Sequence, residues 1–296
     1  MVPKNTLSLA NAIDNSENIL NAAASGKVYD VTLANRKLFH DTNWNTLCLP
    51  FDVTVFEGSP LENAIVKELD TENLYTDAGA IDNEQGTLQT GFDSKNDTLY
   101  LYFKDATSIE AGKPYIVKWA TPAANIVNPV FRSVIVTAQA KDVPNPYRYT
   151  YEDPEYITVA APTDVSFSGG KFCGTYDPTA IYNDEHNMFY LGADNKLYYP
   201  TATDFSVKAF RAYFDLSPAP AGVREYNLNF GEDPSSELTG IVTIPADGRD
   251  SGSPRSVRTG IYTLDGRRVA TDASGFDLKS LRPGLYIVNG KKIVIK

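Results

Sequence analysis

Short apolar segments recur along this chain at intervals that favour a β-rich fold over any helical one. From residue 98 to residue 230 they are rich in Val, Ile, Tyr and Phe, and Gly, Pro, Asn and Asp separate them. Such spacing is typical of a sandwich or barrel, and the strand–helix alternation of a parallel sheet is absent. We therefore expect an all-β fold with an antiparallel β-sandwich body. The expected strands are residues 28–39, 44–55, 65–69, 98–103, 114–119, 130–138, 155–159, 165–176, 188–191, 196–199, 209–216 and 226–230.

One short N-terminal helix is expected between Asp14 and Gly26. Asp14 can cap its first turn, and Ile19, Leu20 and Ala23 form an apolar face. Gly26 can end the helix in the left-handed conformation that glycine adopts easily. The polar residues 70–95 that follow the early strands lack periodicity, and we interpret them as a loop with at most a marginal strand.

The chain divides by composition into three parts. Residues 1–233 form the body, as one sandwich or two sub-sandwiches, and residues 234–256 are a linker rich in Ser, Gly, Pro and Asp. Residues 257–296 form a small C-terminal β module. That module has eight basic and three acidic residues although the whole chain has a net charge of −10, so it differs from the acidic body.

Two hairpins are expected in the C-terminal module. Ile261, Tyr262 and Leu264 lead into Asp265-Gly266, and residues 285–288 lead into Asn289-Gly290. Both dipeptides tolerate the positive φ of a type I′ turn. Apolar or basic residues follow each turn and complete the hairpin.

The tail resembles the C-terminal modules of exported Bacteroidetes proteins. The matching residues run from Gly260 to Lys296 and include "IYTLDGRRV" and "LRPGLYIVNGKKIVIK". In that family the module is a sorting domain of type IX secretion or a relative of one. The resemblance implies export, with the protein at the cell surface, outside the cell or in the periplasm.

The body also resembles a recurrent β-rich module of Bacteroidetes surface proteins. The segments that carry the likeness are "WNTLCLPFDV", "AGKPYIVKW", "FCGTYDP", "FYLGADNKLYYP" and "AFRAYFDL". This resemblance supports surface localisation and supplies no catalytic residue.

Charge and hydropathy exclude some partners. The net charge of −10 argues against nucleic acid, which is bound through clustered Lys and Arg. No apolar run approaches the roughly 20 residues that span a bilayer, so we expect no membrane-spanning segment.

The two cysteines, Cys48 and Cys173, lie in apolar, strand-like segments. They could form a disulfide if those strands are neighbours, or they could be two buried thiols that act as small hydrophobic residues. The apolar neighbours of Cys48 would raise its pKa, which argues against a nucleophile.

No catalytic motif is recognisable. His40 and His186 are the only histidines, and both are expected in solvated loops. Paired carboxylates for glycoside hydrolysis could be formed by the fold, because the chain has 37 acidic residues. The acidic loops lack the spacing of a calcium loop, and we expect no metal site and no cofactor.

Aromatic residues provide the strongest ligand-binding signal. Tyr147, Tyr149 and Tyr151 alternate, so in an extended strand all three would project from one face and could stack on sugar rings. Packing on the core is the alternative. Separately, Asp97-Thr98-Leu99 resembles the O-glycosylation acceptor of exported Bacteroides proteins, which makes Thr98 a candidate attachment site; the alternative is a turn that leads into a strand.

These observations favour a non-enzymatic exported or cell-surface protein with an adhesion, matrix or scaffold role. A carbohydrate-binding protein that uses exposed tyrosines is the first alternative, and a glycoside hydrolase with paired carboxylates is the second. The expected partner is a glycan or a host or surface protein.

Overall fold

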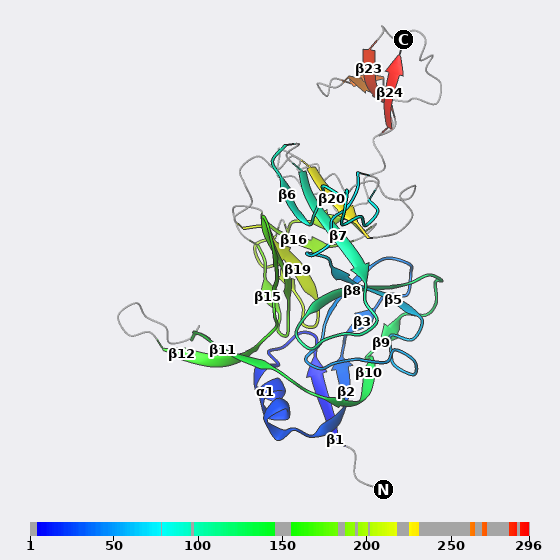
Figure 1. Ribbon diagram of the computed structural model, residues 1–296. Coiled ribbons are helices and arrows are strands. Elements are labelled where there is room, and N and C mark those ends of the chain that lie inside the picture. The colour runs from blue at the N-terminus through cyan, green and yellow to red at the C-terminus, as the bar shows by residue number, and fades with distance from the viewer. Residues whose placement is uncertain are drawn as a thin grey trace. The chain divides into compact units, whose positions relative to one another are not determined.

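The chain is built mainly of strands, and its fold is that of an all-β protein with one short helix. The computed structural model describes residues 5–77, 79–95, 98–145, 155–182, 187–192, 195–200, 202–217, 225–230, 261–263, 268–270, 284–288 and 291–295. The chain separates into two compact units, residues 1–245 and 246–296 (Figure 1). The fold class predicted from the sequence is confirmed.

Two sheets form the sandwich of the first unit. The six-stranded sheet has the order β20-β7-β5-β8-β4, with β6 paired to β7. Its strands are β4 (Asn45–Cys48), β5 (Ala64–Leu69), β6 (Gly91–Asp93), β7 (Thr98–Asp105), β8 (Pro114–Trp119) and β20 (Glu225–Asn229). The five-stranded sheet has the order β13-β14-β19-β16-β17. Its strands are β13 (Val165–Phe167), β14 (Gly170–Gly174), β16 (Met188–Leu191), β17 (Leu197–Tyr198) and β19 (Ala212–Asp215).

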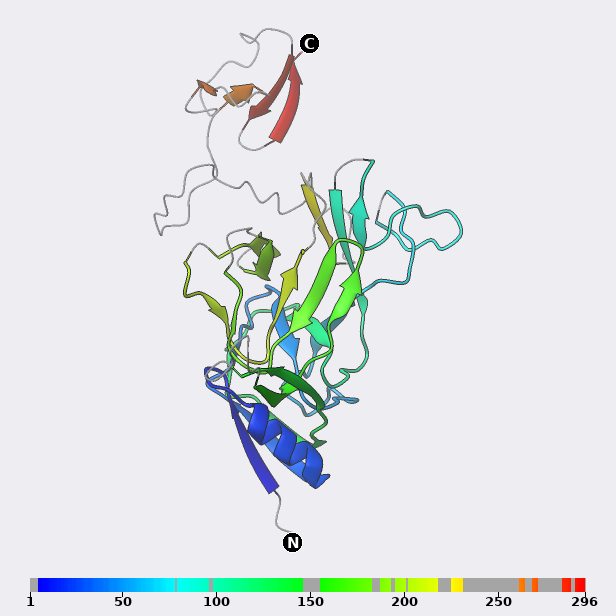
Figure 2. The ribbon, with the colours of Figure 1, turned by 90° about the vertical axis from the view of Figure 1, so that its left-hand side faces the viewer.

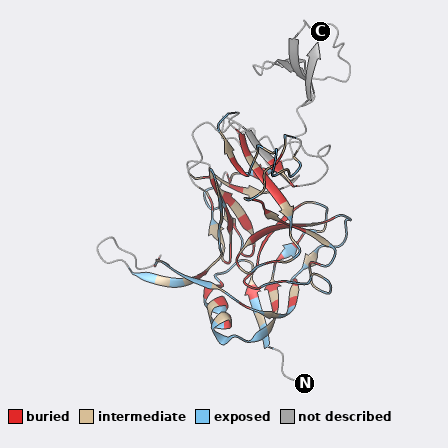
Figure 3. Cartoon of the chain, in the orientation of Figure 1, coloured by how far each residue is buried: buried red, intermediate tan, exposed pale blue. Residues whose placement is uncertain are grey.

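The six-stranded sheet is buried on both faces, and Figure 3 shows the buried residues gathered in these strands. Side chains alternate between the faces of a strand. On β8, Tyr115 and Val117 therefore belong to one hydrophobic core, whereas Ile116 belongs to the other. The core that contains Ile116 lies between the two sheets and includes Phe103, Phe172 and Phe214, from β7, β14 and β19.

The second core lies on the opposite face of the six-stranded sheet. It is covered by α1 (Ser16–Ser25) and by a three-stranded sheet of β1 (Asn5–Ala10), β2 (Val28–Ala34) and β10 (Val130–Ile135), in the order β1-β2-β10. Figure 2 shows α1 beside β1, and Ile19 packs there with Leu9. Gly26 ends the helix at φ 61°, as predicted. The N-cap is Asn15 rather than the predicted Asp14, although Asp14 still accepts the Ser16 N–H at 2.8 Å.

The Asn15 side chain makes no capping hydrogen bond and belongs instead to a buried polar network. Its amide nitrogen donates to the carbonyl oxygens of Ala10, at 2.9 Å, and Tyr176, at 2.8 Å. Its own N–H and the Ser16 hydroxyl donate to the Asp177 carboxylate, at 2.6 and 3.0 Å. The start of α1 is thereby tied to the segment that follows β14.

Three two-stranded sheets complete the first unit. They are β3 (Lys37–Leu38) with β9 (Ile126–Val127), β11 (Gln139–Pro144) with β12 (Tyr156–Ala161), and β15 (Thr179–Ala180) with β18 (Ser206–Val207). The expected strand 28–39 is interrupted, because Asn35 has φ 61°. The expected strand 165–176 is a hairpin instead, with Gly169 at φ 97°. The body also departs from a purely antiparallel sandwich, since β1 pairs with β2 and β20 with β7 in parallel.

The second unit contains a four-stranded sheet of its own, in the order β22-β21-β23-β24. Its strands are β21 (Ile261–Thr263), β22 (Arg268–Ala270), β23 (Gly284–Val288) and β24 (Lys291–Ile295). β21 pairs antiparallel with β22, and β23 pairs antiparallel with β24. These are the strand pairs of the two predicted hairpins.

A buried carboxylate organises the loop that follows β5. Asp70 is fully buried and accepts hydrogen bonds from the Tyr75 hydroxyl at 2.7 Å and the Asn73 amide at 2.6 Å. The backbone N–H groups of Glu72 and Asn73 donate to the same carboxylate, at 3.0 and 3.2 Å. Burial raises the pKa of Asp70, but these donors more than offset it and hold that pKa below its ordinary value.

We expect Asp70→Asn to lower the free energy of unfolding by about 3 kcal/mol. The asparagine side chain would place its own N–H groups against the donors that now bind the Asp70 carboxylate. Asp82→Asn is the control, since its carboxylate accepts only exposed backbone N–H groups. That change should cost less than about 1 kcal/mol. Urea denaturation of both variants measures the difference, and equal losses would contradict this role for Asp70.

The same carboxylate should make stability depend on pH. A depressed pKa in the folded state means that the contribution of Asp70 is complete above the unfolded pKa of about 4. It is lost as the pH falls through the folded pKa. Below about pH 4 the stability of the unmodified protein should therefore fall toward that of Asp70→Asn, in urea melts run at several pH values.

Candidate functional site

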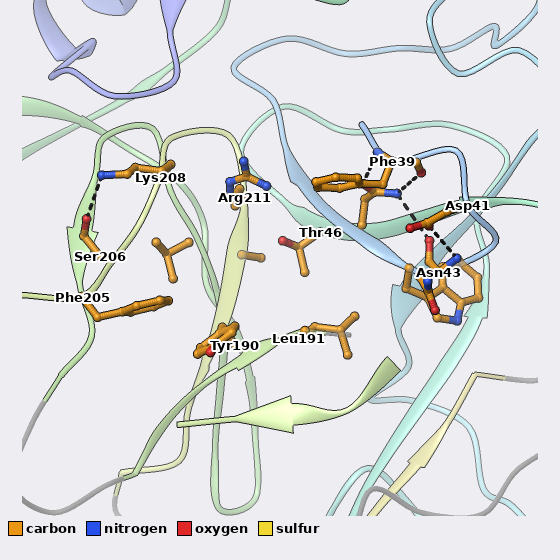
Figure 4. A pocket seen from close by; sticks show the side chains of 15 residues that line it. Phe39, Asp41, Asn43, Thr46, Tyr190, Leu191, Phe205, Ser206, Lys208 and Arg211 are labelled. Carbon is orange, nitrogen blue, oxygen red and sulfur yellow. Dashed lines mark hydrogen bonds between the residues drawn. The ribbon is translucent and has the colours of Figure 1, made fainter. Parts of the chain in front are cut away.

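A cavity of about 470 Å³ opens in the first unit where three segments meet (Figure 4). The segment between β3 and β4 provides Phe39 and Asp41, and β16 provides Tyr190. Phe205, just before β18, and Arg211, just before β19, come from the third segment. Its other lining residues are Asn43, Trp44, Asn45, Thr46, Leu191, Gly192, Ser206, Val207, Lys208 and Ala212. A concave site that combines apolar and aromatic side chains with polar groups is the usual form of a small-molecule site.

Aromatic rings form much of the cavity wall. Tyr190 stacks on Phe205, with 4.7 Å between ring centroids and 25° between ring planes. Tyr190 also stacks on Tyr198 at 5.8 Å. In Figure 4, Tyr190 and Phe205 lie on one side of the cavity and Phe39 lies on the other.

Phe39 is held in place through its backbone. The buried Asn45 side chain accepts the Phe39 N–H at 2.7 Å and donates to the Phe39 carbonyl at 2.8 Å. The Asn45 amide thus pairs with the chain as a neighbouring strand would. This pairing fixes the chain direction between β3 and β4 and leaves the Phe39 ring 45% exposed.

Thr175 fixes the turn that carries Lys208 and Arg211. Its buried hydroxyl donates to the Lys208 carbonyl at 2.9 Å and accepts the Arg211 N–H at 3.1 Å. The backbone of Thr175 bonds to the Arg211 carbonyl and to the Phe210 N–H, at 2.9 and 2.7 Å. Phe210 has φ 59°, a conformation that is rare for a bulky residue and that tertiary contacts must maintain.

The charged residues that line the cavity are two cations, Lys208 and Arg211, and one carboxylate, Asp41. Burial lowers the pKa of the Arg211 guanidinium, and behind the wall burial and the charge of Arg211 lower that of Arg36 further. Arg36 is fully buried and donates to the carbonyl oxygens of Lys37 and Thr46, at 2.6 and 2.8 Å. Asp41 is the one acidic residue among the described lining residues, and it is exposed.

No protein family matches the sequence, and no curated protein or solved structure matches it significantly. Within the described ranges, no cluster of three or more His, Cys, Asp or Glu residues could hold a metal ion. No helix in that part of the chain is long and apolar enough to cross a bilayer.

The candidate sugar-stacking residues Tyr147, Tyr149 and Tyr151 lie outside the described residues, as does His186. Thr98, the candidate glycosylation site, begins β7 and is 4% exposed. A transferase could not reach its hydroxyl in the folded body, so that interpretation requires modification before folding. His40 packs against Trp119, with 4.5 Å between ring centroids, and does not line the cavity.

The structure has Cys48 and Cys173 as free, buried thiols, which fits the buried-thiol alternative. The physical reason is the alternation of side chains along β14. Cys48 packs against the backbone of Gly174, where a side chain would collide with its sulfur. Cys173, one residue earlier, therefore faces the other side. Burial raises the pKa of both thiols, to about 12 for Cys173.

Sequence reasoning did not find this cavity. A basic residue within the apolar run "AFRAYFDL" was a usable signal, because Arg211 would otherwise be poorly placed in a buried strand. No local sequence pattern indicated the other lining residues, because residues such as Thr46, Tyr190 and Arg211 lie far apart along the chain.

Thiol accessibility should confirm the state of the cysteines. A thiol reagent such as Ellman's reagent should label neither cysteine in the folded protein, because both thiols are buried and protonated. Unfolding in guanidinium without reductant should expose two reactive thiols. Absence of labelling after unfolding would indicate a disulfide.

We expect Thr175→Val to lower the free energy of unfolding by about 1–3 kcal/mol, because it leaves buried partners without a hydrogen bond. Thr158→Val is the matched control, since the exposed Thr158 hydroxyl bonds only to the Asp142 side chain. The control should change stability by less than about 0.5 kcal/mol. Chemical denaturation compares the two, and equal effects would refute the role of Thr175 in the turn.

Proposed function

We propose that this chain is a non-enzymatic exported or cell-surface protein that binds a saccharide in the cavity of its body. The observation that carries the proposal is the aromatic wall made by Tyr190 and Phe205, opposite Phe39. Sugar rings bind proteins through the stacking of their apolar faces on such rings. The carbohydrate-binding alternative from the sequence therefore has a second possible location, away from Tyr147, Tyr149 and Tyr151.

The lining of the cavity favours binding over hydrolysis. Glycoside hydrolysis ordinarily requires two carboxyl groups on either side of the scissile bond. Of the lining residues that the structure describes, only Asp41 has a carboxyl group. The proposal is therefore recognition without turnover.

An adhesion or matrix role is the biological setting that we propose for this binding. It is supported by the resemblance of residues 260–296 to sorting modules and by an all-β body of the kind that surface proteins use. Surface labelling of intact cells that express the chain tests the location. Labelling only after lysis would contradict surface display.

An array of neutral and acidic oligosaccharides, followed by calorimetric titration, tests the binding. Tyr190→Ala and Phe205→Ala should each weaken the affinity for a bound sugar about tenfold, which corresponds to about 1.4 kcal/mol. Tyr156→Ala is the control, because Tyr156 is 55% exposed on β12 and does not line the cavity. The proposal fails if no saccharide binds, or if all three variants bind like the unmodified protein.

A further inference from the structure

Two arginines lie close together in the body, and neither has an acidic partner among the residues that the structure describes. Arg36 and Arg211 are near enough for the charge of Arg211 to act on Arg36. Among the described residues, no ion pair or hydrogen bond is made by the Arg211 guanidinium. The Arg36 Nε is likewise buried without a partner in that part of the chain.

This arrangement of two arginines is unfavourable when no anion is bound beside them. Buried cations are normally paired, and two like charges that lie close together disfavour each other. Arginine cannot relieve this by losing its proton, because its pKa is too high. Arg36 is fully buried and Arg211 is partly buried. Elsewhere in the body the buried Lys67 pairs its ammonium with Asp105 at 2.6 Å.

The cavity provides the place where the missing anion could bind. Arg211 lines it, and the Thr175 hydrogen bonds and the positive φ of Phe210 fix the backbone that presents this side chain. Lys208 lies on the same side in Figure 4, whereas Asp41 lies across the view. Because Asp41 is exposed to solvent, its charge is screened more than that of Arg211.

The side chains that line the cavity indicate which kind of anion would bind there. A planar guanidinium binds a carboxylate through two parallel hydrogen bonds, and the aromatic pair offers a face for an adjoining ring. A volume of about 470 Å³ lies within the usual range for small-molecule sites.

We infer that the ligand is an acidic saccharide, with the carboxylate of a hexuronic acid on Arg211 and its ring against Tyr190 and Phe205. Arg36 supports this interaction from behind the wall through its charge, without contacting the sugar. The inference rests on the proposed function and specifies its ligand class.

Calorimetric titration with trigalacturonate and with its uncharged counterpart, galactotriose, tests the inference. The uronate should bind at least tenfold more tightly. Arg211→Gln should remove that preference, because the affinity for trigalacturonate falls to about that for galactotriose. Arg211→Lys should restore part of the preference, because it returns the charge without the paired hydrogen bonds.

Arg132→Gln is the matched control, since it removes one positive charge from an exposed side chain that pairs with Asp30. It should leave the preference intact. Arg211→Met adds a readout that is independent of any ligand. It removes a partly buried charge that has no acidic partner among the described residues, and we expect the melting temperature of the free protein to stay the same or rise. A clear fall would mean that Arg211 is structural and would overturn the inference.

The outcomes separate the two proposals. Equal binding of both trisaccharides, with Arg211→Gln unchanged, overturns the inference and leaves saccharide binding in place. Tighter binding of a sulfated trisaccharide than of the uronate overturns the assignment of a carboxylate. Failure of every saccharide to bind overturns both proposals.

Discussion

The burial of one sheet on both faces is the constraint on which the rest of the body depends. Each inner strand of the six-stranded sheet must place apolar side chains on both faces, as Tyr115, Ile116 and Val117 do in succession. One face closes against the five-stranded sheet, and the other closes against α1 and the three-stranded sheet. A polar change on an inner strand would therefore disturb one core or the other.

Some buried polar groups find all their hydrogen-bond partners within the described part of the body, and others do not. Asn15, Asp70 and Thr175 are each surrounded by hydrogen-bond partners, and each joins segments that the sheets alone do not connect. Arg36 and Arg211 differ, because their charges have no acidic partner among the described residues. Since interiors normally satisfy their charges, this exception is a physical reason to place a ligand beside Arg211.

The sequence predicted the parts of the fold that local chemistry controls. The apolar runs around Leu101 and Ile116 became β7 and β8, and Gly26 ended α1 in the left-handed conformation. The short strand β1 was missed, and β6 was expected only as a marginal strand, because their neighbours in space define them more than their own composition does. The break at Asn35 was also missed, since an asparagine at positive φ resembles any other polar residue within a strand.

Composition and periodicity by themselves determined that the chain is β-rich, that one helix lies near its start, and that its tail contains two hairpins. Only the tertiary structure decided how Cys48 and Cys173 face, because a one-residue difference along a strand reverses the direction of a side chain. It alone also brought Phe39, Tyr190 and Arg211 together. These residues lie on segments far apart in the chain, and no local pattern encodes the distance between them. The sequence determines the chemistry of each residue, whereas a binding site forms only where the fold makes those residues neighbours.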